Sequence, residues 1–351
     1  MIIRDLCHAM RFSFYLPCYW PDLSYPAHRL YEDAIEESVL AEALGFDTLC
    51  IPEHHFINYL THPQPLLTAV KVASRTRAIR IITSVLVLPV HDMRRLAGEI
   101  CQADCLMEGR LELGVGRGAF AYEFDRFNVP PEESRERFDD ALALLEALLS
   151  GRETGWKSRW YDFEPVAITP HSLQKPIPLW IAALGYEAIY HSVRRGYHVQ
   201  TTPLRGGMET VRMQAGAFND ARRDGGAACD GARFSMLRMV YVAENEADRR
   251  EKIAMAHDNH RRFCNVFHTP GTVSNGEIVP LDIAESMDDI ADALPIGTAR
   301  EVVDKLGDYE NLDVMDLLCN MSFGASHRDV MASMERFARD VMPHFERQGT
   351  P

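Results

Sequence analysis

The chain lacks a hydrophobic run long enough to cross a membrane, because none approaches the ~20 apolar residues that a membrane-spanning helix needs. Its opening stretch, MIIRDLCHAMRFSFYLP, also lacks the long apolar core and the small-residue cleavage site of a secretory signal. Together these absences predict a cytoplasmic protein that has no membrane partner.

An excess of positive charge is also missing. Lysine and arginine number 37 against 51 aspartates and glutamates, so the formal net charge is −14. A surface of this sign repels phosphate backbones and anionic lipid headgroups, and the charge therefore argues against a nucleic-acid partner.

The eight cysteines are scattered rather than clustered, and a chain of 351 residues needs no disulfide framework to fold. We expect them to be reduced thiols that mostly fill the core. Cys101 and Cys105 fall on one face of a predicted helix, a spacing that metal sites use, but no other cluster of ligands accompanies them. We therefore expect no metal site at this pair.

Short apolar runs alternate with amphipathic helical patterns along the whole chain, without a shift in composition, and predict one domain over residues 1–351. Strands are expected at 11–17, 47–52, 79–89, 110–116, 178–184, 197–203, 234–243 and 313–324. Helices are expected at 28–46, 64–76, 93–107, 131–151, 186–195, 207–224, 244–265, 297–312 and 326–345. Such βα repeats predict a closed (β/α)8 barrel, with an open doubly wound sheet as the alternative.

Two segments interrupt this alternation. Residues 152–178, after the fourth helix, are aromatic and Pro-rich, which predicts a hairpin followed by an extended stretch. Residues 269–296, before the last strand, predict an insertion with a short helix. That insertion is either a lid over the site or a surface decoration.

The segment IPEHHF ends the second predicted strand, where a barrel collects its chemistry. Adjacent residues of an extended segment point to opposite faces, so His54 and His55 cannot easily share a metal ion. The helical spacing of zinc histidines is absent too. We interpret His54 as catalytic or cofactor-contacting, His55 as structural, and Glu53 as a residue that could orient its neighbour. A metal-dependent barrel hydrolase, with ligands from other strands, stays open.

Three glycines end the fourth strand, in LELGVGRGAF. The dinucleotide fingerprint G-x-G-x-x-G fails because Ala119 occupies its last position, and no helix is expected between the strand at 110–116 and residue 131. We interpret Gly114, Gly116 and Gly118 as letting the backbone approach a bulky ligand. Arg117 offers a fixed cation suited to phosphate, or else a salt bridge at the barrel rim.

Six segments in this order and spacing resemble the bacterial luciferase-like flavin-dependent monooxygenase family. They are RFSFYLP, PEHHF, TSVLVLP, RLELGVGRG, PIPLWIAA and IGTAREVVDKL, and the resemblance covers nearly the whole chain. It implies a (β/α)8 barrel that binds flavin mononucleotide (FMN) at the C-terminal mouth.

The resemblance also implies roles around the flavin ring. His54 matches the histidine near its reactive edge. From the residues alone, Ser84 and Val85 could face a flat ligand or simply be buried strand; the resemblance matches them to a pair joined by a non-proline cis peptide behind the ring. Luciferase carries a reactive cysteine where this chain has Gly116, so light emission is not implied.

A phosphate site is implied as well. The helix predicted after strand 178–184 begins with backbone N–H groups that can bind an anion. Gly185 and Tyr186 match the positions whose amides cradle the flavin phosphate, and Arg117 and Arg135 match arginines that reach it. Luciferase places side-chain hydroxyls here, whereas this chain has Gly185 and Ala188, which makes weak flavin binding plausible.

The implied activity is that of a two-component monooxygenase. A separate NAD(P)H:flavin reductase would supply reduced FMN, which with O2 forms a C4a-(hydro)peroxyflavin that oxygenates a small organic substrate. His54 would manage protons, since imidazoles titrate near neutral pH. Family members commonly dimerise, so a homodimer is expected.

Two further alternatives keep the same fold. One is a hydride-transfer dehydrogenase that uses the deazaflavin F420 in place of FMN and needs no oxygen. The other is a non-catalytic flavin-binding subunit, against which the presence of His54, Arg117 and Arg135 argues.

Overall fold

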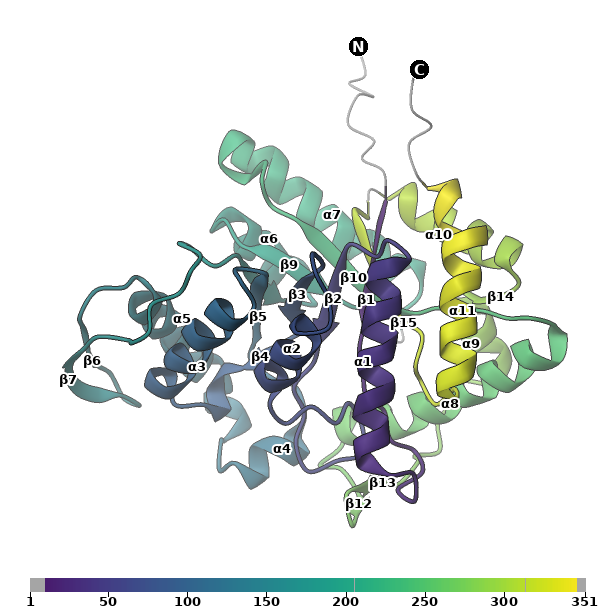
Figure 1. Ribbon diagram of the computed structural model, residues 1–351, viewed down its shortest axis with the longest axis horizontal. Helices are drawn as coiled ribbons and strands as arrows, with labels where there is room; N and C mark the ends of the chain where they lie inside the picture. Colours follow the sequence, from purple (N-terminus) through teal and green to yellow (C-terminus); the bar gives the residue numbers. More distant parts are fainter. Residues whose placement is uncertain (1–9, 205, 313, 346–351) are drawn as a thin grey trace.

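A closed barrel of parallel β-strands forms the centre of the molecule, as seen in a computed structural model that describes residues 10–204, 206–312 and 314–345 (Figure 1). Each strand pairs with the next, and the last returns to the first. The barrel strands are β1 (Arg11–Tyr15), β2 (Thr48–Ile51), β3 (Arg80–Thr83), β5 (Leu111–Gly116), β8 (Leu179–Ala182), β9 (His198–Thr201), β10 (Phe234–Met239) and β15 (Asp316–Asn320). The predicted (β/α)8 barrel is confirmed, and the open sheet is excluded.

Helices surround this barrel (Figure 1). They are α1 (Ala27–Ala43), α2 (Pro65–Ala73), α3 (Met93–Leu106), α5 (Ser134–Leu149), α6 (Tyr186–Arg194), α7 (Met208–Gly225), α8 (Glu246–His268), α10 (Ala299–Glu310) and α11 (His327–Asp340). Across the part of the chain that the structure describes, no helix is both long and apolar enough to span a membrane.

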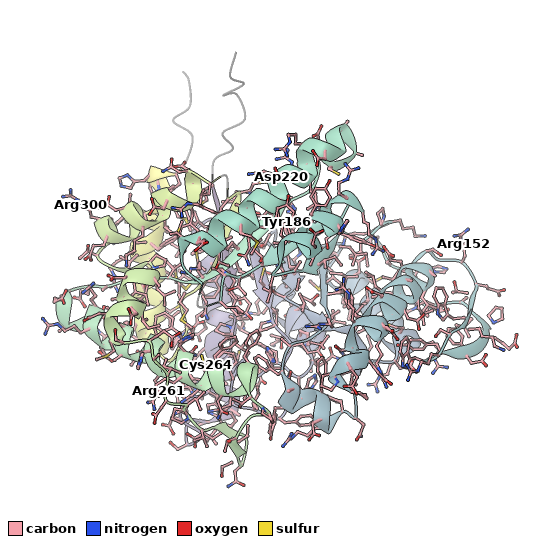
Figure 2. All side chains as sticks on the ribbon, turned by 180° about the vertical axis from the view of Figure 1, so that it is seen from behind. Arg152, Tyr186, Asp220, Arg261, Cys264 and Arg300 are labelled. Atoms are coloured by element: carbon pink, nitrogen blue, oxygen red, sulfur yellow. The ribbon has the colours of Figure 1, made fainter. Side chains whose placement is uncertain are left out.

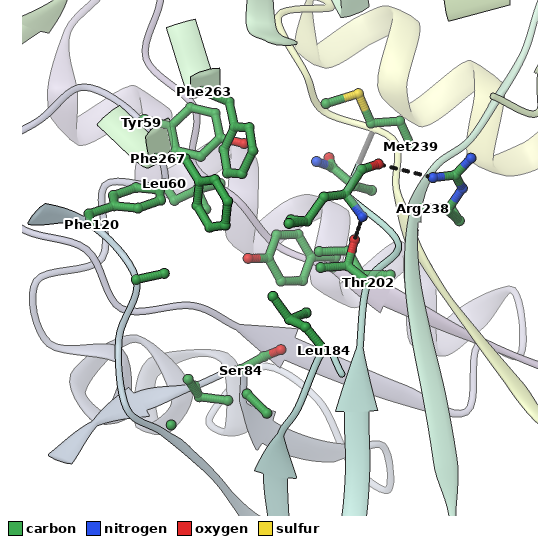
Figure 3. Close-up of a pocket in the computed structure, with 18 of the residues that line it drawn as sticks. Tyr59, Leu60, Ser84, Phe120, Leu184, Thr202, Arg238, Met239, Phe263 and Phe267 are labelled. Carbon is green, nitrogen blue, oxygen red and sulfur yellow. Dashed lines mark hydrogen bonds between the residues drawn. The ribbon is translucent and has the colours of Figure 1, made fainter. Parts of the chain in front are cut away.

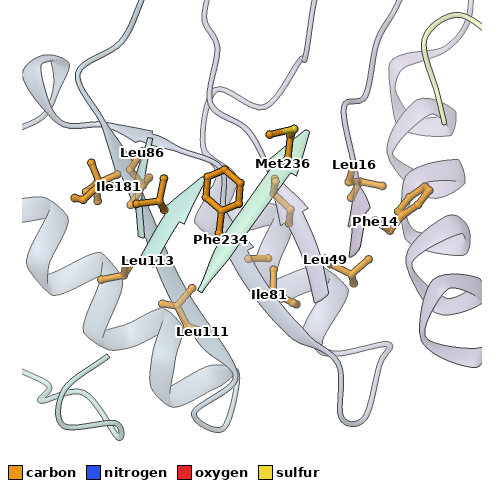
Figure 4. Close-up of a cluster of buried hydrophobic side chains, with 14 of the residues drawn as sticks. Phe14, Leu16, Leu49, Ile81, Leu86, Leu111, Leu113, Ile181, Phe234 and Met236 are labelled. Carbon is orange, nitrogen blue, oxygen red and sulfur yellow. The ribbon is translucent and has the colours of Figure 1, made fainter. Parts of the chain in front are cut away.

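Side chains alternate across each strand and so divide the core into two layers. Phe14, Leu49 and Ile81 point outward and pack with the helices in the larger hydrophobic cluster (Figure 4). Their neighbours Tyr15 and Cys50 belong to a second cluster. The outer layer holds helices to barrel, whereas the inner layer builds the floor of the barrel mouth.

Strand 79–89 is not continuous, contrary to the prediction. β3 ends at Thr83, and β4 (Leu86–Val87) and a 3-10 turn, η1 (Leu88–Val90), follow. The peptide between Ser84 and Val85 is cis, as the family resemblance implied. Strand 234–243 is also divided, because β11 (Tyr241–Val242) leaves the barrel to pair with β14 (Ile296–Gly297).

The prediction that no helix lies between the fourth strand and residue 131 is wrong. A short helix, α4 (Ala121–Arg126), lies between β5 and α5. Six residues are too few for a helical period to emerge from the sequence pattern. The helix forms because its apolar side chains Tyr122 and Phe124 are buried against the rest of the chain.

Both predicted insertions are present. Residues 152–178 contain the antiparallel hairpin β6 (Thr154–Lys157) and β7 (Asp162–Val166). Residues 269–296 contain the hairpin β12 (Val273–Ser274) and β13 (Glu277–Ile278), followed by α9 (Met287–Ala293). Asn58, on the loop after β2, fastens this second hairpin: its N–H donates to Gly276 O at 2.7 Å, and its Oδ1 accepts from Ile278 N–H at 3.1 Å.

His327 ties the last helix to the first. Its Nδ1 lies 3.1 Å from Glu37 Oε1, and its Nε2 lies 3.2 Å from Glu36 Oε2. The hydrogen bond with Glu37 is the main reason that the pKa of His327 rises to about 9, against the lowering effect of burial. At neutral pH the imidazolium therefore compensates the buried Glu37 carboxylate between α1 and α11.

We expect this contact to make stability depend on pH. The folded-state pKa of His327 lies above its usual value of ~6.5, so the stabilisation is complete below that pH and is lost as pH rises through about 9. His327→Gln should cost on the order of 1–2 kcal/mol of unfolding free energy at pH 6, and much less at pH 10. Urea unfolding at both pH values measures this. His191→Gln, at an exposed position of α6, is the control, and an equal cost of His327→Gln at both pH values would contradict the charge-based role.

Candidate functional site

A cavity of about 570 Å³ opens at the carboxyl ends of the barrel strands. The strand ends form its floor, and helices α8 and α9 contribute to its walls. In Figure 3 the rings of Tyr59, Phe120, Phe263 and Phe267 gather on one side of the cavity, and Ser84 lies on the other. The insertion that contains α9 therefore borders the cavity, which is where the lid hypothesis requires it to be.

His54 lines this cavity and is held by a carboxylate that the sequence interpretation missed. Its Nδ1 lies 3.1 and 3.2 Å from the two carboxylate oxygens of buried Glu123, and its ring stacks on Phe120 at 4.3 Å. Because a carboxylate only accepts hydrogen bonds, Nδ1 carries the proton and Nε2 is left as the basic nitrogen. The N–H of His55 also donates to Glu123, at 2.6 Å, so one carboxylate fixes both ring and backbone.

His55 turns away from the cavity towards a second buried carboxylate. Glu53 Oε1 lies 2.8 Å from Nε2 of both His55 and His91, and Glu53 Oε2 accepts from Val87 N–H at 2.9 Å. Burial alone would raise the pKa of Glu53, but these hydrogen bonds lower it to about 2. Glu53 is thus an ionised anchor between the loop after β2 and the segment after β4. No group of three ligating side chains suited to a metal ion occurs among the described residues.

Two glycines of β5 make room for a neighbouring strand of the barrel. A Cβ on Gly114 would lie 1.9 Å from the carbonyl oxygen of Thr83, and one on Gly116 would lie 2.6 Å from Val85 Cγ2. The close approach that we predicted is real, but the atoms that approach belong to the bend between β3 and β4. Glycine at these two positions lets Ser84 and Val85 reach the cavity wall.

The predicted phosphate end lies in the same cavity, which Arg117, Arg135 and Gly185 all line. Arg117 is exposed and has no ion pair with any residue that the structure describes. Arg135 makes one exposed contact, at 3.4 Å from Asp139. Gly185 is the N-cap of α6 and offers no side-chain cap, which leaves the first N–H groups of that helix open.

Tyr186 is the one predicted residue that does not line the cavity. Its hydroxyl donates to Asp220 Oδ2 at 2.8 Å on the outer surface. Its predicted contribution was a backbone amide at the start of α6, and that role stays a prediction. The other predicted residues, His54, Ser84, Val85, Arg117, Arg135 and Gly185, lie around one cavity.

This donor set fits a flat molecule that carries a phosphate group. The two guanidinium groups and the uncapped start of α6 supply the cationic and N–H donors that phosphate binds. Ser84, Val85 and Gly116 present backbone and small side chains, which leave room for a flat ring beside them.

A model of the family described as Luciferase-like monooxygenase matches residues 10–315. The chain belongs to this family. The oxygenase component of flavin-dependent trigonelline monooxygenase from Acinetobacter baylyi is 29% identical over 347 residues, or 96% of each chain.

Solved structures of luciferase-like proteins share the fold. Monooxygenase RslO1 from Streptomyces bottropensis has a TM-score of 0.82 at 23% identity, covering 96% of this chain and 100% of that one. An F420-dependent secondary alcohol dehydrogenase has a TM-score of 0.75 at 15% identity, covering 96% and 99%. The fold is thus shared by a monooxygenase and by an F420-dependent enzyme, and the family of this chain is one of flavin-dependent monooxygenases and oxidoreductases.

We expect Gly114→Ala to destabilise the barrel where β5 packs against the end of β3, and so to disturb the cavity wall at Ser84. The new methyl group would collide with a backbone carbonyl that cannot swing aside, so the unfolding free energy should fall by about 3 kcal/mol or more. Chemical unfolding measures the change. Gly98→Ala is the matched control, because that position in α3 has nothing within 4 Å of the added Cβ and should gain up to about 1 kcal/mol. Similar stabilities for the two variants would contradict the packing argument.

Proposed function

We propose that this protein is the oxygenase component of a two-component FMN-dependent monooxygenase that acts on a small organic substrate. The observation that carries the proposal is one cavity lined by two arginines, by the uncapped start of α6 and by a histidine held by a buried carboxylate. The trigonelline monooxygenase relative, itself an oxygenase component, supports a separate NAD(P)H:flavin reductase as partner. The single domain over residues 1–351, the homodimer and the cytoplasmic location remain predictions from the sequence.

Reduced FMN, when bound, would supply the activation of O2 and the transfer of one oxygen atom to the substrate. The chain itself has three tasks. Arg117, Arg135 and the start of α6 hold the phosphate and so orient the ring. The aromatic wall that includes Phe120 and Phe263 excludes water from the reacting region.

Proton handling falls to His54. Because Glu123 keeps the proton of the imidazole on Nδ1, Nε2 can accept a proton from a reacting group and return it later. Glu123 is thus a positioning residue that acts through His54. The same pair argues against a non-catalytic flavin-binding subunit, which has no use for an oriented base.

The alternative cofactor is F420, and the alternative activity is hydride transfer. The F420 enzyme of similar fold is only 15% identical, so it bears on the fold alone, whereas the relative at 29% identity is a flavin-dependent monooxygenase. We therefore place FMN first and O2 as the co-substrate.

A flavin titration tests the cofactor. The absorbance of oxidised FMN should change on binding, F420 should bind more weakly, and Arg117→Ala should weaken FMN binding about tenfold or more through the lost charge-assisted hydrogen bonds. Arg152→Ala is the control, since Arg152 lies in the exposed region before β6 at the edge of the molecule (Figure 2) and does not line the cavity. Tighter binding of F420 than of FMN would overturn the cofactor assignment, and an unaltered titration of Arg117→Ala would remove its phosphate role.

Oxygen consumption tests the reaction. With reduced FMN, O2 and an accepted substrate, His54→Ala should retain the fold but lower coupled oxygenation about 10²-fold and raise the share of H2O2 released. Glu123→Gln, which keeps the shape but removes the charge, should show a smaller loss and a changed pH profile. Unchanged coupling in His54→Ala would exclude His54 from the reaction, and a wild-type pH profile in Glu123→Gln would exclude the positioning role.

A further inference from the structure

Two polar side chains on the floor of the cavity have hydrogen-bonding groups that the protein itself does not use. Tyr15 and Asn320 stand opposite each other in the register of β1 and β15, and both line the cavity while being 4% and 6% exposed. Asn320 Oδ1 accepts from Ser322 N–H at 3.2 Å. Within the described ranges, its amide NH2 and the Tyr15 hydroxyl have no hydrogen-bond partner in the protein.

A third unused group lies close by. Tyr59 is 7% exposed, lines the cavity, and its hydroxyl likewise has no partner in the described parts of the chain. Burial is the main reason that the pKa values of Tyr15 and Tyr59 are raised. The nearby Tyr59 phenol adds to the rise at Tyr15, and the nearby Tyr19 phenol adds to the rise at Tyr59. Both hydroxyls are therefore protonated at neutral pH and can donate.

The unused donors of Tyr15, Tyr59 and Asn320 favour a ligand that carries a hydrogen-bond acceptor. Donors on a cavity wall that the protein itself does not use are open to a ligand, and a ligand that satisfies them gains their hydrogen bonds. Two phenolic O–H groups and one amide NH2 can each donate. A ligand oxygen with lone pairs, as in a carbonyl or carboxylate, is the matching group.

The aromatic side chains beside these donors indicate what the rest of the ligand is. Phe263 and Phe267 stack at 4.9 Å, and Tyr59 lies 6.1 Å from Phe263 and 6.4 Å from Phe120. Figure 3 shows these four rings side by side along the cavity. Aromatic faces and edges arranged in this way favour a flat ring packed against them.

We propose that Tyr15, Asn320 and Tyr59 form the substrate-recognition site, and that the substrate is an aromatic compound bearing an acceptor oxygen, either a carbonyl or a carboxylate. The ring packs against the aromatic wall while its oxygen accepts hydrogen bonds from the floor. This inference rests on the proposed function, since it assigns the part of the cavity that the phosphate end does not occupy. It makes Tyr15 a specificity-determining residue.

Ligand binding to the whole protein tests the inference without turnover. Acetophenone carries the carbonyl, benzoate the carboxylate, and isopropylbenzene has a similar shape without oxygen. Calorimetry should show the wild type binding at least one of the two oxygen-bearing probes more tightly than isopropylbenzene, and which one binds decides between carbonyl and carboxylate. Tyr15→Phe should weaken that probe about tenfold and leave isopropylbenzene and FMN unchanged.

Tyr19→Phe is the matched control. Tyr19 is a buried phenol 5.8 Å from the Tyr59 ring, but it does not line the cavity, so its loss should leave all three probes unchanged. Preference for isopropylbenzene, binding of none of the probes, or equal weakening of all three in Tyr15→Phe would overturn the inference. So would weaker FMN binding with unchanged probe binding, because Tyr15 would then contact the cofactor.

The result is separable from that of the proposed function. If reduced FMN is not oxidised faster in the presence of the protein, the monooxygenase assignment fails, while calorimetry still reports on the recognition site. If flavin oxidation is accelerated but Tyr15→Phe binds every probe as the wild type does, the monooxygenase assignment stands and the recognition site is wrong.

Discussion

The contact between the bend after β3 and the glycines of β5 is the constraint on which the site depends. β3 pairs with β5 up to Ile82, leaves the ladder at Thr83, and returns as β4 beside Val115 and Gly116. The departure turns Ser84 and Val85 towards the barrel mouth. It is possible only because the facing positions of β5 carry no side chain. The cavity wall at Ser84 and Val85 therefore depends on glycine in β5, because a side chain there would fill the space that the bend occupies.

Two buried carboxylates, Glu53 and Glu123, then hold the loop after β2 in place. Glu53 joins the loop after β2 to Val87 and His91, and Glu123 joins the same loop to α4. The His54 ring binds Glu123 and the His55 ring binds Glu53, so these two adjacent side chains point in different directions. Burying a carboxylate is costly unless donors surround it, so these hydrogen bonds restrict the loop. His54 is held in the cavity by Glu123 together with its stacking on Phe120.

The local sequence pattern predicted most of the barrel. It failed where a feature depends on contacts between residues that are far apart in the chain, or where a helix is too short to show a period. Strand and helix periods predicted every barrel strand, because the outward residues of each strand must face helices, as Phe14 and Leu49 do. The six-residue helix α4 was missed because it spans less than two turns. Glu123 was missed with it, since its partner His54 lies 69 residues away and nothing local marks the pair. The glycines of β5 were noticed, but a sequence does not say whether a ligand or a neighbouring strand comes close.

The cavity offers two kinds of hydrogen-bond donor, which constrains how two different molecules could share it. Arg117, Arg135 and the start of α6 supply positive charge and open N–H groups, which stabilise an anion. Tyr15, Tyr59 and Asn320 supply neutral donors, and aromatic rings lie beside Tyr59. In the proposed function, a phosphorylated cofactor would place its phosphate at the two arginines and the start of α6, and Ser84 and Val85 would face its ring. The proposed substrate would then occupy the part of the cavity that Tyr15, Tyr59 and Asn320 line, and His54 lines the same cavity. The proposed cofactor would thus complete the pocket into which the proposed substrate fits.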